Sequence, residues 1–455
     1  MNIPPVQQLD QHGLSAAVDW KLGENYSLKS VTAWREYDST WASDADNSPL
    51  PSQQLLQTLK HWQKSQELRL NGQALNDRVD FTVGAFWFKQ GGTLQARVDL
   101  NYSGIDFIHG PDPTPSRSIA GFAHADWHLT DSTDLTTGLR YTDDHKSYTF
   151  FRRNPDGSIP TPCAGAPNLP TTNPNCVLTN LYDRSASFDS TQLDWRAVLS
   201  HRWSEAISTY ASIATGYKGG GINPRPFFPQ QILGFNPEEL TTFELGAKTD
   251  LFERRLRVNG AVFLNKYKDI ILTLSNCPGL GSPAAPCALP ANIGKADVKG
   301  AELEVSLRLG GGFSIDSSFS KLDFQYKDTG GTAVTLGMIT PYTPELKGSL
   351  GLQYEHDMPS GALLVLRTDW QAQSEIYTAA VNNQFNRIPG YGIGNLRATF
   401  RSPQRDWEAS FELANVNNKL YYLSKNDFSA TGSAGTTAGQ PGLPRTWAMT
   451  IKRTF

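Results

Sequence analysis

Apolar and polar residues alternate one by one along many segments of this chain. One segment places five apolar side chains on a single face, with polar ones between them: Val79, Phe81, Val83, Ala85 and Trp87. The same period recurs in four further segments: 193–200, 242–248, 346–355 and 364–373. A period of two is that of a β-strand, and about ten residues is the length of a tilted strand that crosses a membrane. The pattern therefore predicts an all-β chain of long amphipathic strands.

The last fourteen residues, 442–455, follow the same rule and end on an aromatic residue. Four apolar side chains share one face of the predicted strand: Trp447, Met449, Ile451 and Phe455. Arg453 interrupts this row, and an arginine near a membrane boundary can extend its charged group to the headgroups. An ordinary amphipathic strand on a soluble sheet would show the same alternation, so this segment alone leaves both structures open.

The connections between the predicted strands alternate in length. Six are short and polar: 23–25, 131–133, 204–205, 310–312, 358–361 and 402–405. Eight are long: 39–57, 91–115, 152–186, 219–237, 274–291, 328–343, 377–389 and 425–441. Short turns at one rim and long loops at the other are typical of outer-membrane barrels, whereas soluble sandwiches have strands of about five or six residues. The connections therefore favour a transmembrane antiparallel β-barrel.

We predict about seventeen strands in all, from near Leu14 to Phe455. Single-chain bacterial barrels have an even number, with both termini on the periplasmic side. If the long loops are extracellular, the first strand here runs from outside to inside. We therefore expect residues 1–455 to be the C-terminal part of a larger barrel. The segment 93–105 also alternates and could add a strand or a hairpin within its loop.

Composition narrows the class of protein further. The mean hydropathy is −0.41, and no run approaches the roughly 18 apolar residues of a membrane helix. Aromatic residues make up 11% of the chain, which suits the interfacial girdles of a barrel but also a soluble glycan-binding β protein. The net charge is −3 without a basic run, so we expect no nucleic-acid partner. The first residues lack the charged and apolar regions of a signal peptide.

The four cysteines form two local pairs in segments rich in proline and glycine. Cys163 lies near Cys176, and Cys277 lies near Cys287. A disulfide closing a loop of this size stabilises a fold by about 3 kcal/mol in the chain-entropy model, and it implies an oxidising compartment. Neither pair has a spacing with histidine that would indicate a metal site. We expect two disulfides that stiffen extracellular loops; four free thiols are the alternative.

Six segments follow one another in order along nearly the whole chain: SQELRL (65–70), ATGYKGGGINPRP (214–226), 235–270, ANIGKADVKGAELE (291–304), ELANVNNKLYY (412–422) and the terminal GLPRTWAMTIKRTF. Together they resemble the barrel of a TonB-dependent outer-membrane receptor. The resemblance implies a 22-stranded barrel in the bacterial outer membrane, filled by an N-terminal plug. It also implies uptake of a scarce ligand such as a ferric siderophore, driven by the TonB energy complex through an N-terminal box.

Relative to that family, the plug, the box and about five strands are missing. Residues 1–455 would then be one barrel domain, truncated on its N-terminal side, with seventeen of 22 strands. The resemblance further implies that the barrel-assembly machinery recognises the last strand with its terminal aromatic. We expect the chain to be unable to transport alone. A passive porin-like channel and a soluble glycan-binding protein remain the alternatives.

One loop carries the strongest candidate for ligand binding. Three glycines, 219–221, are flanked by side chains that could meet an anionic or aromatic ligand: Lys218, Asn223, Arg225, Phe227 and Phe228. Concave ligand sites combine a few fixed polar groups with apolar ones. The glycines alone could instead serve a tight strand exit, in which case the loop has a structural role.

Other constellations give no catalytic or metal chemistry. His124, Asp126 and His128 share one strand face, but the two histidines lie roughly 13 Å apart and cannot bind one ion, so they should line the solvated lumen. Glu302 and Glu304 should line the lumen and pair with basic groups. The segment 44–48 resembles a calcium loop only weakly. No HExxH, P-loop, GxSxG or GxGxxG motif occurs, so we expect neither an enzyme nor a cofactor.

Overall fold

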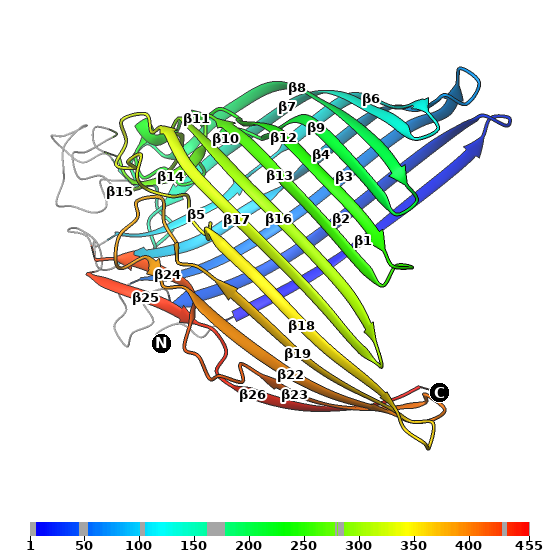
Figure 1. Ribbon diagram of the computed structural model, residues 1–455. Coiled ribbons are helices and arrows are strands. Elements are labelled where there is room, and N and C mark those ends of the chain that lie inside the picture. Colours follow the sequence, from blue (N-terminus) through cyan, green and yellow to red (C-terminus); the bar gives the residue numbers. More distant parts are fainter. Residues whose placement is uncertain are drawn as a thin grey trace.

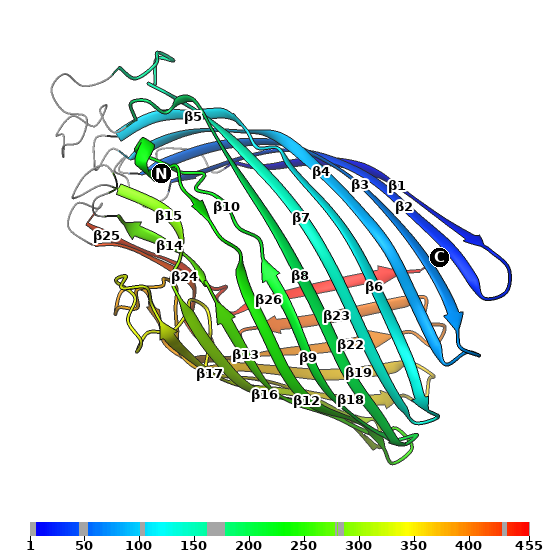
Figure 2. The ribbon, with the colours of Figure 1, turned by 90° about the horizontal axis from the view of Figure 1, so that it is seen from above.

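The computed structural model describes residues 6–44, 53–100, 105–161, 178–277, 280, 286–429 and 435–454 (Figure 1). In this part of the chain, eighteen strands form one sheet that curls into an open barrel (Figures 1 and 2). Each strand pairs antiparallel with its neighbours. Within the described residues, no helix is long and apolar enough to cross a membrane.

The strands of the main sheet are β1 (Val6–Lys21), β2 (Tyr26–Asp44), β3 (Gln54–Ala74), β4 (Val79–Leu100), β5 (Ile105–Pro113), β6 (Ser116–Thr130), β7 (Thr133–Arg153), β8 (Tyr182–Ser204), β9 (Ile207–Lys218), β12 (Glu238–Leu251), β13 (Leu256–Lys268), β16 (Lys295–Gly310), β17 (Phe313–Asp328), β18 (Leu346–Asp357), β19 (Leu363–Gln373), β22 (Tyr391–Arg401), β23 (Trp407–Ala414) and β26 (Thr446–Arg453). Four small hairpins lie in the long connections: β10 (Gly221–Ile222) with β11 (Gly234–Phe235), β14 (Ile271–Asn276) with β15 (Pro286–Asn292), β20 (Ile376–Tyr377) with β21 (Arg387–Ile388), and β24 (Tyr422–Phe428) with β25 (Thr436–Pro441). A 3-10 turn, η3, covers Pro229–Gln231.

The predicted number of strands agrees with this sheet. Strand β5 pairs with the upper part of β4, from Thr93 to Leu100, and touches only the end of β7. It is therefore the hairpin that the alternation in 93–105 left open. The other strands of the main sheet number seventeen among the described residues.

The long connections are shorter than the sequence predicted. Strand β4 continues through 91–100 and β2 continues to Asp44, in segments that we expected to be loops. Strands β3 and β4 have 21 and 22 residues, about twice the number that a tilted strand needs to cross a membrane. In the membrane barrel that the sequence predicts, the halves of β3 and β4 at the long-connection rim would extend beyond the hydrocarbon core, and they keep pairing there.

Register separates an apolar outer face from a polar inner face. At the end of the sheet, Trp447 lies opposite Leu413 and Met449 lies opposite Phe411, with Trp447 and Met449 72% and 64% exposed. On the other face, a guanidinium nitrogen of Arg397 lies 3.3 Å from a carboxylate oxygen of Glu412. This is the arrangement predicted for the terminal strand, in which Ile451 also faces outward; Phe455 lies outside the described residues.

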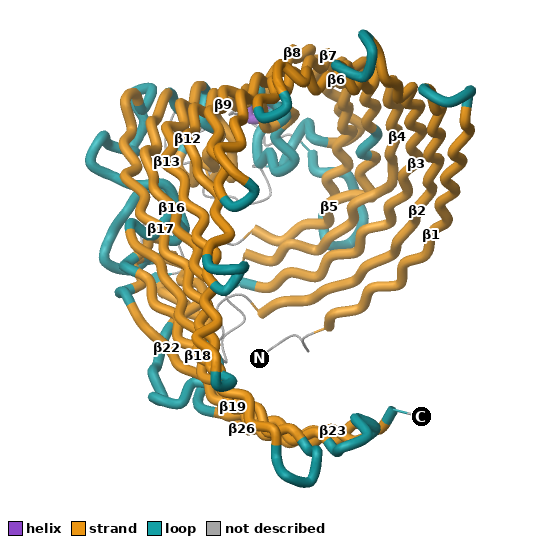
Figure 3. Tube along the Cα trace, turned by 45° about the vertical axis from the view of Figure 1, so that its right-hand side comes forward, coloured by secondary structure: helices purple, strands orange, loops and turns teal. Residues whose placement is uncertain are grey.

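The sheet has two edges in the described part of the chain. Strand β1 pairs with β2 alone, and β26 pairs with β23 alone. Figure 3 shows the first and last strands facing each other without contact. Both strands run from the rim with the long connections to the rim with the short turns (Figures 1 and 2). The first strand therefore has the direction that the sequence predicted.

The buried cores of the molecule lie at the long-connection rim. One cluster joins Leu100, Ile105 and Phe107 to Leu181 and Phe228. Three further clusters lie under other connections, centred on Ile293, on Phe150 and on the cysteines of the β14–β15 hairpin. The barrel wall between the rims has exposed apolar residues outside and polar ones inside, so packed cores position only the loops.

Candidate functional site

The loop from 219 to 237 lies at the long-connection rim and is held by its own side chains. The Asn223 amide nitrogen donates to the backbone carbonyl of Gln231 at 2.9 Å, and the amide of Arg225 donates to Asn223 Oδ1 at 3.1 Å. The Phe227 amide donates to Gln231 Oε1 at 2.8 Å. Asn223 and Gln231 are both fully buried. These side chains therefore fix the path of the loop between its two short strands, β10 and β11.

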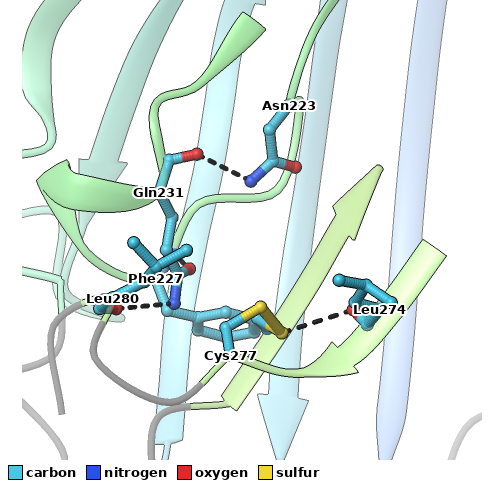
Figure 4. Close-up of a disulfide and its surroundings, with 7 residues drawn as sticks. Asn223, Phe227, Gln231, Leu274, Cys277 and Leu280 are labelled. Atoms are coloured by element: carbon cyan, nitrogen blue, oxygen red, sulfur yellow. Dashed lines mark hydrogen bonds between the residues drawn. A yellow bond between two sulfur atoms is a disulfide. The ribbon is translucent and has the colours of Figure 1, made fainter. Parts of the chain in front are cut away.

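Gln231 also joins this loop to the β14–β15 hairpin. Its amide nitrogen donates to the carbonyl of Leu280 at 3.2 Å, beside the disulfide between Cys277 and Cys287 (Figure 4). The two sulfurs pack with Leu274, Leu280 and Leu289 in one buried cluster. The predicted disulfide is therefore present and supports a contact between two loops. Cys163 and Cys176 lie outside the described residues.

The five candidate ligand residues of this loop fall into two groups. Asn223 is fully buried and Phe228 is 8% exposed, inside the cluster with Leu181. Phe227 is half-buried, with its ring edge-on to Phe107 at 6.1 Å between centroids. Lys218 and Arg225 are exposed. The structure thus gives Asn223 and Phe228 a structural position, while the two cations and part of Phe227 stay accessible.

A buried ion pair lies next to this loop, and no feature of the sequence predicted it. A guanidinium nitrogen of Arg152 on β7 lies 2.7 Å from Asp112 Oδ2 on β5, and both side chains are essentially inaccessible to solvent. The other terminal nitrogen of Arg152 donates to the carbonyl of Pro224 at 3.3 Å. Asp112 Oδ1 accepts the amide of Phe151 at 2.8 Å. One charge pair therefore joins β5, β7 and the loop 219–237.

His109 completes this buried group. Its Nε2 lies 2.7 Å from Asp112 Oδ2 and 3.0 Å from the Tyr148 hydroxyl. Burial lowers the pKa of His109 and outweighs the hydrogen bond to Asp112, which raises it; the charge of Arg152 adds a smaller lowering. Burial raises the pKa of Asp112, but His109 and Arg152 outweigh it, so the net shift is downward. The site therefore holds a neutral imidazole beside an ionised pair.

Sequence reasoning missed these residues because they come from distant segments. Arg152 follows Asp112 by forty residues, and neither lies in a recognisable motif. The only feature of the sequence that could have indicated this site is the polar character of β7 on the long-connection side of the expected membrane. Arg225 also acts electrostatically on His109, so the loop 219–237 adds positive charge to this corner of the mouth.

The other constellations line the inner wall or lie elsewhere. His124 Nε2 lies 3.2 Å from Asp126, and His128 bridges Asp80 and Asp134 at 3.0 and 2.7 Å. In the part of the chain that the structure describes, no group of three or more His, Cys, Asp or Glu side chains is arranged so that it could hold a metal ion. Asp44 is buried at the end of β2, and Asp46 lies outside the described residues.

Glu302 and Glu304 do line the inner face, but the predicted pairs with basic groups do not form. Within the described residues neither carboxylate lies within ion-pair distance of a basic side chain. Glu304 instead borders a polar hollow of about 420 Å³ with Asp316, Arg367 and Asp369. Arg367 already pairs with Asp369 at 2.8 Å and with Asp316 at 3.3 Å, so it is not available to Glu304.

Comparison with known proteins agrees with this architecture. The family model for the TonB dependent receptor-like β-barrel matches residues 3–418. The pesticin receptor of Yersinia enterocolitica is 26% identical over 331 residues, which cover 72% of this chain and 43% of that receptor. The chain therefore spans less than half the length of this relative.

Solved structures show the same fold. The ferric yersiniabactin uptake receptor FyuA from Yersinia pestis superposes with a TM-score of 0.79 at 17% identity, over 99% of this chain and 62% of that one. The siderophore receptor PiuA from Acinetobacter baumannii gives a TM-score of 0.73 at 15% identity, over 98% of this chain and 64% of that one. The chain belongs to the TonB-dependent receptor family and forms an outer-membrane β-barrel wall.

Proposed function

We propose that this chain is the barrel portion of a receptor that imports a scarce small ligand, such as a ferric siderophore, across the outer membrane. One observation supports this proposal best. The inner wall is lined by charged side chains, and the tightly packed mouth above it keeps two cations, Lys218 and Arg225, accessible. The relatives support the ligand class, since their names refer to ferric yersiniabactin and to a siderophore. The fold itself does not select the ligand.

In this proposal Lys218, Arg225 and the accessible part of Phe227 form the ligand contact. Ferric siderophores carry oxygen donors and negative charge, which two cations and an aromatic ring can meet. Asn223 and Phe228 hold the loop that presents these groups. Arg152 and Asp112 fix the strands beneath it. The buried residues thus position the exposed ones and do not touch the ligand.

Energy coupling is a property of the whole receptor, of which we propose these residues to be one part. Neighbouring strands of the sheet are antiparallel, and both edge strands run in the same direction, so an antiparallel closure needs an odd number of further strands. Five would give the 22 of the family. We propose that these strands, the plug and the segment that meets the TonB complex belong to the same receptor, and that the barrel-assembly machinery recognises β26.

Uptake and binding assays test this proposal. Cells that lack their own receptors and produce this chain should bind radiolabelled ferric siderophore without importing it, and K218Q/R225Q should weaken that binding about tenfold. The matched control, K21Q/R405Q, removes two exposed cations at the short-turn rim, far from the mouth, and should leave binding unchanged. Import by the chain alone, or a steady current through it in a planar bilayer, would instead favour a passive porin-like channel.

A further inference from the structure

The three glycines at the start of the loop 219–237 make room for side chains from the barrel wall. None of the three has a left-handed backbone, so conformational freedom does not explain them. A Cβ atom on Gly219 would lie 3.1 Å from the ammonium nitrogen of Lys146, and one on Gly221 would lie 3.9 Å from Lys146 Cδ. A Cβ atom on Gly220 would lie 2.7 Å from the ring of Phe188. The side chain of Lys146 therefore lies across the glycines.

Lys146 faces the inside of the barrel at the mouth. It is the fourteenth residue of β7 counted from the short-turn end, and a tilted strand crosses the hydrocarbon core in about 9–11 residues. Tyr141 is 53% exposed on the outer face, and Lys146 follows it by an odd number of residues, so its side chain lies on the inner face. Lys218 directly precedes the glycines. Two cationic residues therefore adjoin where the loop leaves the wall.

The charge of Lys146 is not neutralised by the protein. Its ammonium donates to the carbonyl of Gly220 at 2.6 Å, and the side chain is half-buried. Among the described residues, no carboxylate oxygen lies within 4 Å of this ammonium. Asp144 lies on the same face of β7, but it accepts the hydroxyl of Tyr217 at 3.1 Å. A charge partly withdrawn from water without a counter-ion is costly, so the site favours an anion supplied from outside.

Glu238 is a second acid near the start of the loop, and it too is engaged. It lies opposite Lys218 in the sheet, but its carboxylate accepts the amide of Ile271 at 2.7 Å. Arg225 adds a third cation, and it is exposed. Three cations therefore stand against two carboxylates, and both carboxylates accept hydrogen bonds from uncharged groups. This part of the mouth keeps a positive charge.

We propose that Lys146 contacts the ligand and makes the site selective for metal chelates with negative charge over neutral chelates. The inference rests on the proposed function and names the class of ligand. An ammonium is a compact charge that binds phenolate, catecholate or carboxylate oxygens. It can leave the neutral carbonyl of Gly220 for such an oxygen, because attraction between opposite charges adds to the hydrogen bond. A neutral chelate gains nothing from this exchange.

Binding of two ferric chelates to the whole 455-residue chain in detergent micelles tests the proposal. Ferric enterobactin is a trianionic tris-catecholate, and ferrichrome is a neutral trihydroxamate. K146Q should weaken binding of ferric enterobactin about tenfold, since a hydrogen bond to a charged group contributes about one factor of ten at a partly exposed site. The same variant should leave the affinity for ferrichrome within about twofold.

Two further variants separate a ligand contact from a structural role. Glutamine can still donate to the carbonyl of Gly220, so K146Q keeps the loop contact and removes the charge. K146R keeps the charge and should bind ferric enterobactin within about threefold of the unchanged chain. K21Q removes an exposed lysine at the short-turn rim and should bind both chelates like the unchanged chain. Circular dichroism confirms the strand content of each variant.

Lysine acetylation read by mass spectrometry locates the contact on cells that produce the chain. Ferric enterobactin should slow acetylation of Lys146 several-fold, whereas ferrichrome should not, and Lys21 should react equally in all samples. This measurement needs no detergent, so it also covers poor folding in micelles. Raising the salt concentration from about 50 mM to about 500 mM should weaken binding of ferric enterobactin more in the unchanged chain than in K146Q.

The outcomes distinguish this inference from the proposed function. Loss of ferric enterobactin binding in K218Q/R225Q with full binding in K146Q would support the proposed function and overturn the inference. Equal weakening of both chelates in K146Q would mean that Lys146 only holds the loop, which also overturns the inference. Absence of binding of either chelate to the unchanged chain would overturn both.

Discussion

The two rims of the barrel are built on different principles. At the short-turn rim, turns of a few residues join the strands, and their side chains are largely exposed. At the long-connection rim, the loops contain four buried clusters and an ion pair from which water is excluded. The barrel wall therefore depends on register and on its surrounding lipid. The mouth, in contrast, depends on packing between its own loops.

The largest expected effect follows from breaking the buried ion pair at the mouth. R152M should destabilise the mouth by about 3–5 kcal/mol, because it leaves the Asp112 carboxylate buried without its partner. Urea unfolding in micelles and protease cleavage of the loop 219–237 measure the change. The control is R257M at the short-turn rim, where the pair with Asp250 is exposed and its loss should not be measurable. Equal effects at the two rims would contradict the comparison.

Deleting a large side chain from the mouth should come next in size. F228A leaves a cavity among Leu181, Phe107 and their neighbours and should cost about 3 kcal/mol. Phe313 at the start of β17 is a matched aromatic residue that is 53% exposed. F313A should change the urea midpoint much less. If both variants unfold at the same urea concentration, Phe228 does not belong to a packed core.

Removing the disulfide should have a smaller and more local effect. C277S/C287S opens a loop of about ten residues and should cost about 2–3 kcal/mol in the chain-entropy model. Because Gln231 donates to Leu280 beside the disulfide, the loop 219–237 should also become easier to cleave. Limited proteolysis with mass spectrometry locates the cuts. Cleavage confined to the β14–β15 hairpin would show that this contact does not couple the two loops.

Acidification should give the smallest effect, and only at the mouth. The pKa of His109 is lowered in the folded chain, so the unfolded chain takes up a proton first as the pH falls below about 6.5. Stability of the mouth is therefore complete above that pH and declines below it. The lowered pKa of Asp112 adds a second loss only in strong acid, below about pH 4.

Cleavage rates of the loop 219–237 between pH 8 and pH 5 measure this effect. They should rise on acidification in the unchanged chain and stay nearly flat in H109Q, which keeps a hydrogen-bonding group without the titration. A control cut at the short-turn rim should show no such rise. A flat profile in the unchanged chain would mean that His109 stays neutral in both states.

The sequence pattern was sufficient to predict the barrel wall, where side chains face lipid and lumen in strict alternation. The seventeen wall strands, their two faces and the direction of β1 and β26 were predicted, because a period of two directly reports an apolar outside and a polar inside. Two short turns contain no glycine and were not predicted. At 75–77 and 252–254 the backbone is left-handed in residues other than glycine, so the usual glycine marker was missing.

The chain by itself determined a barrel wall and the family to which it belongs. Only the tertiary structure decided what the mouth is made of. It buried Asn223 and Phe228, which looked like ligand contacts, and brought together Arg152, Asp112 and His109 from separate strands. The physical reason is that a wall strand meets lipid and lumen in a fixed alternation. A loop residue is buried or exposed according to the other loops that fold against it, and local sequence does not encode those partners.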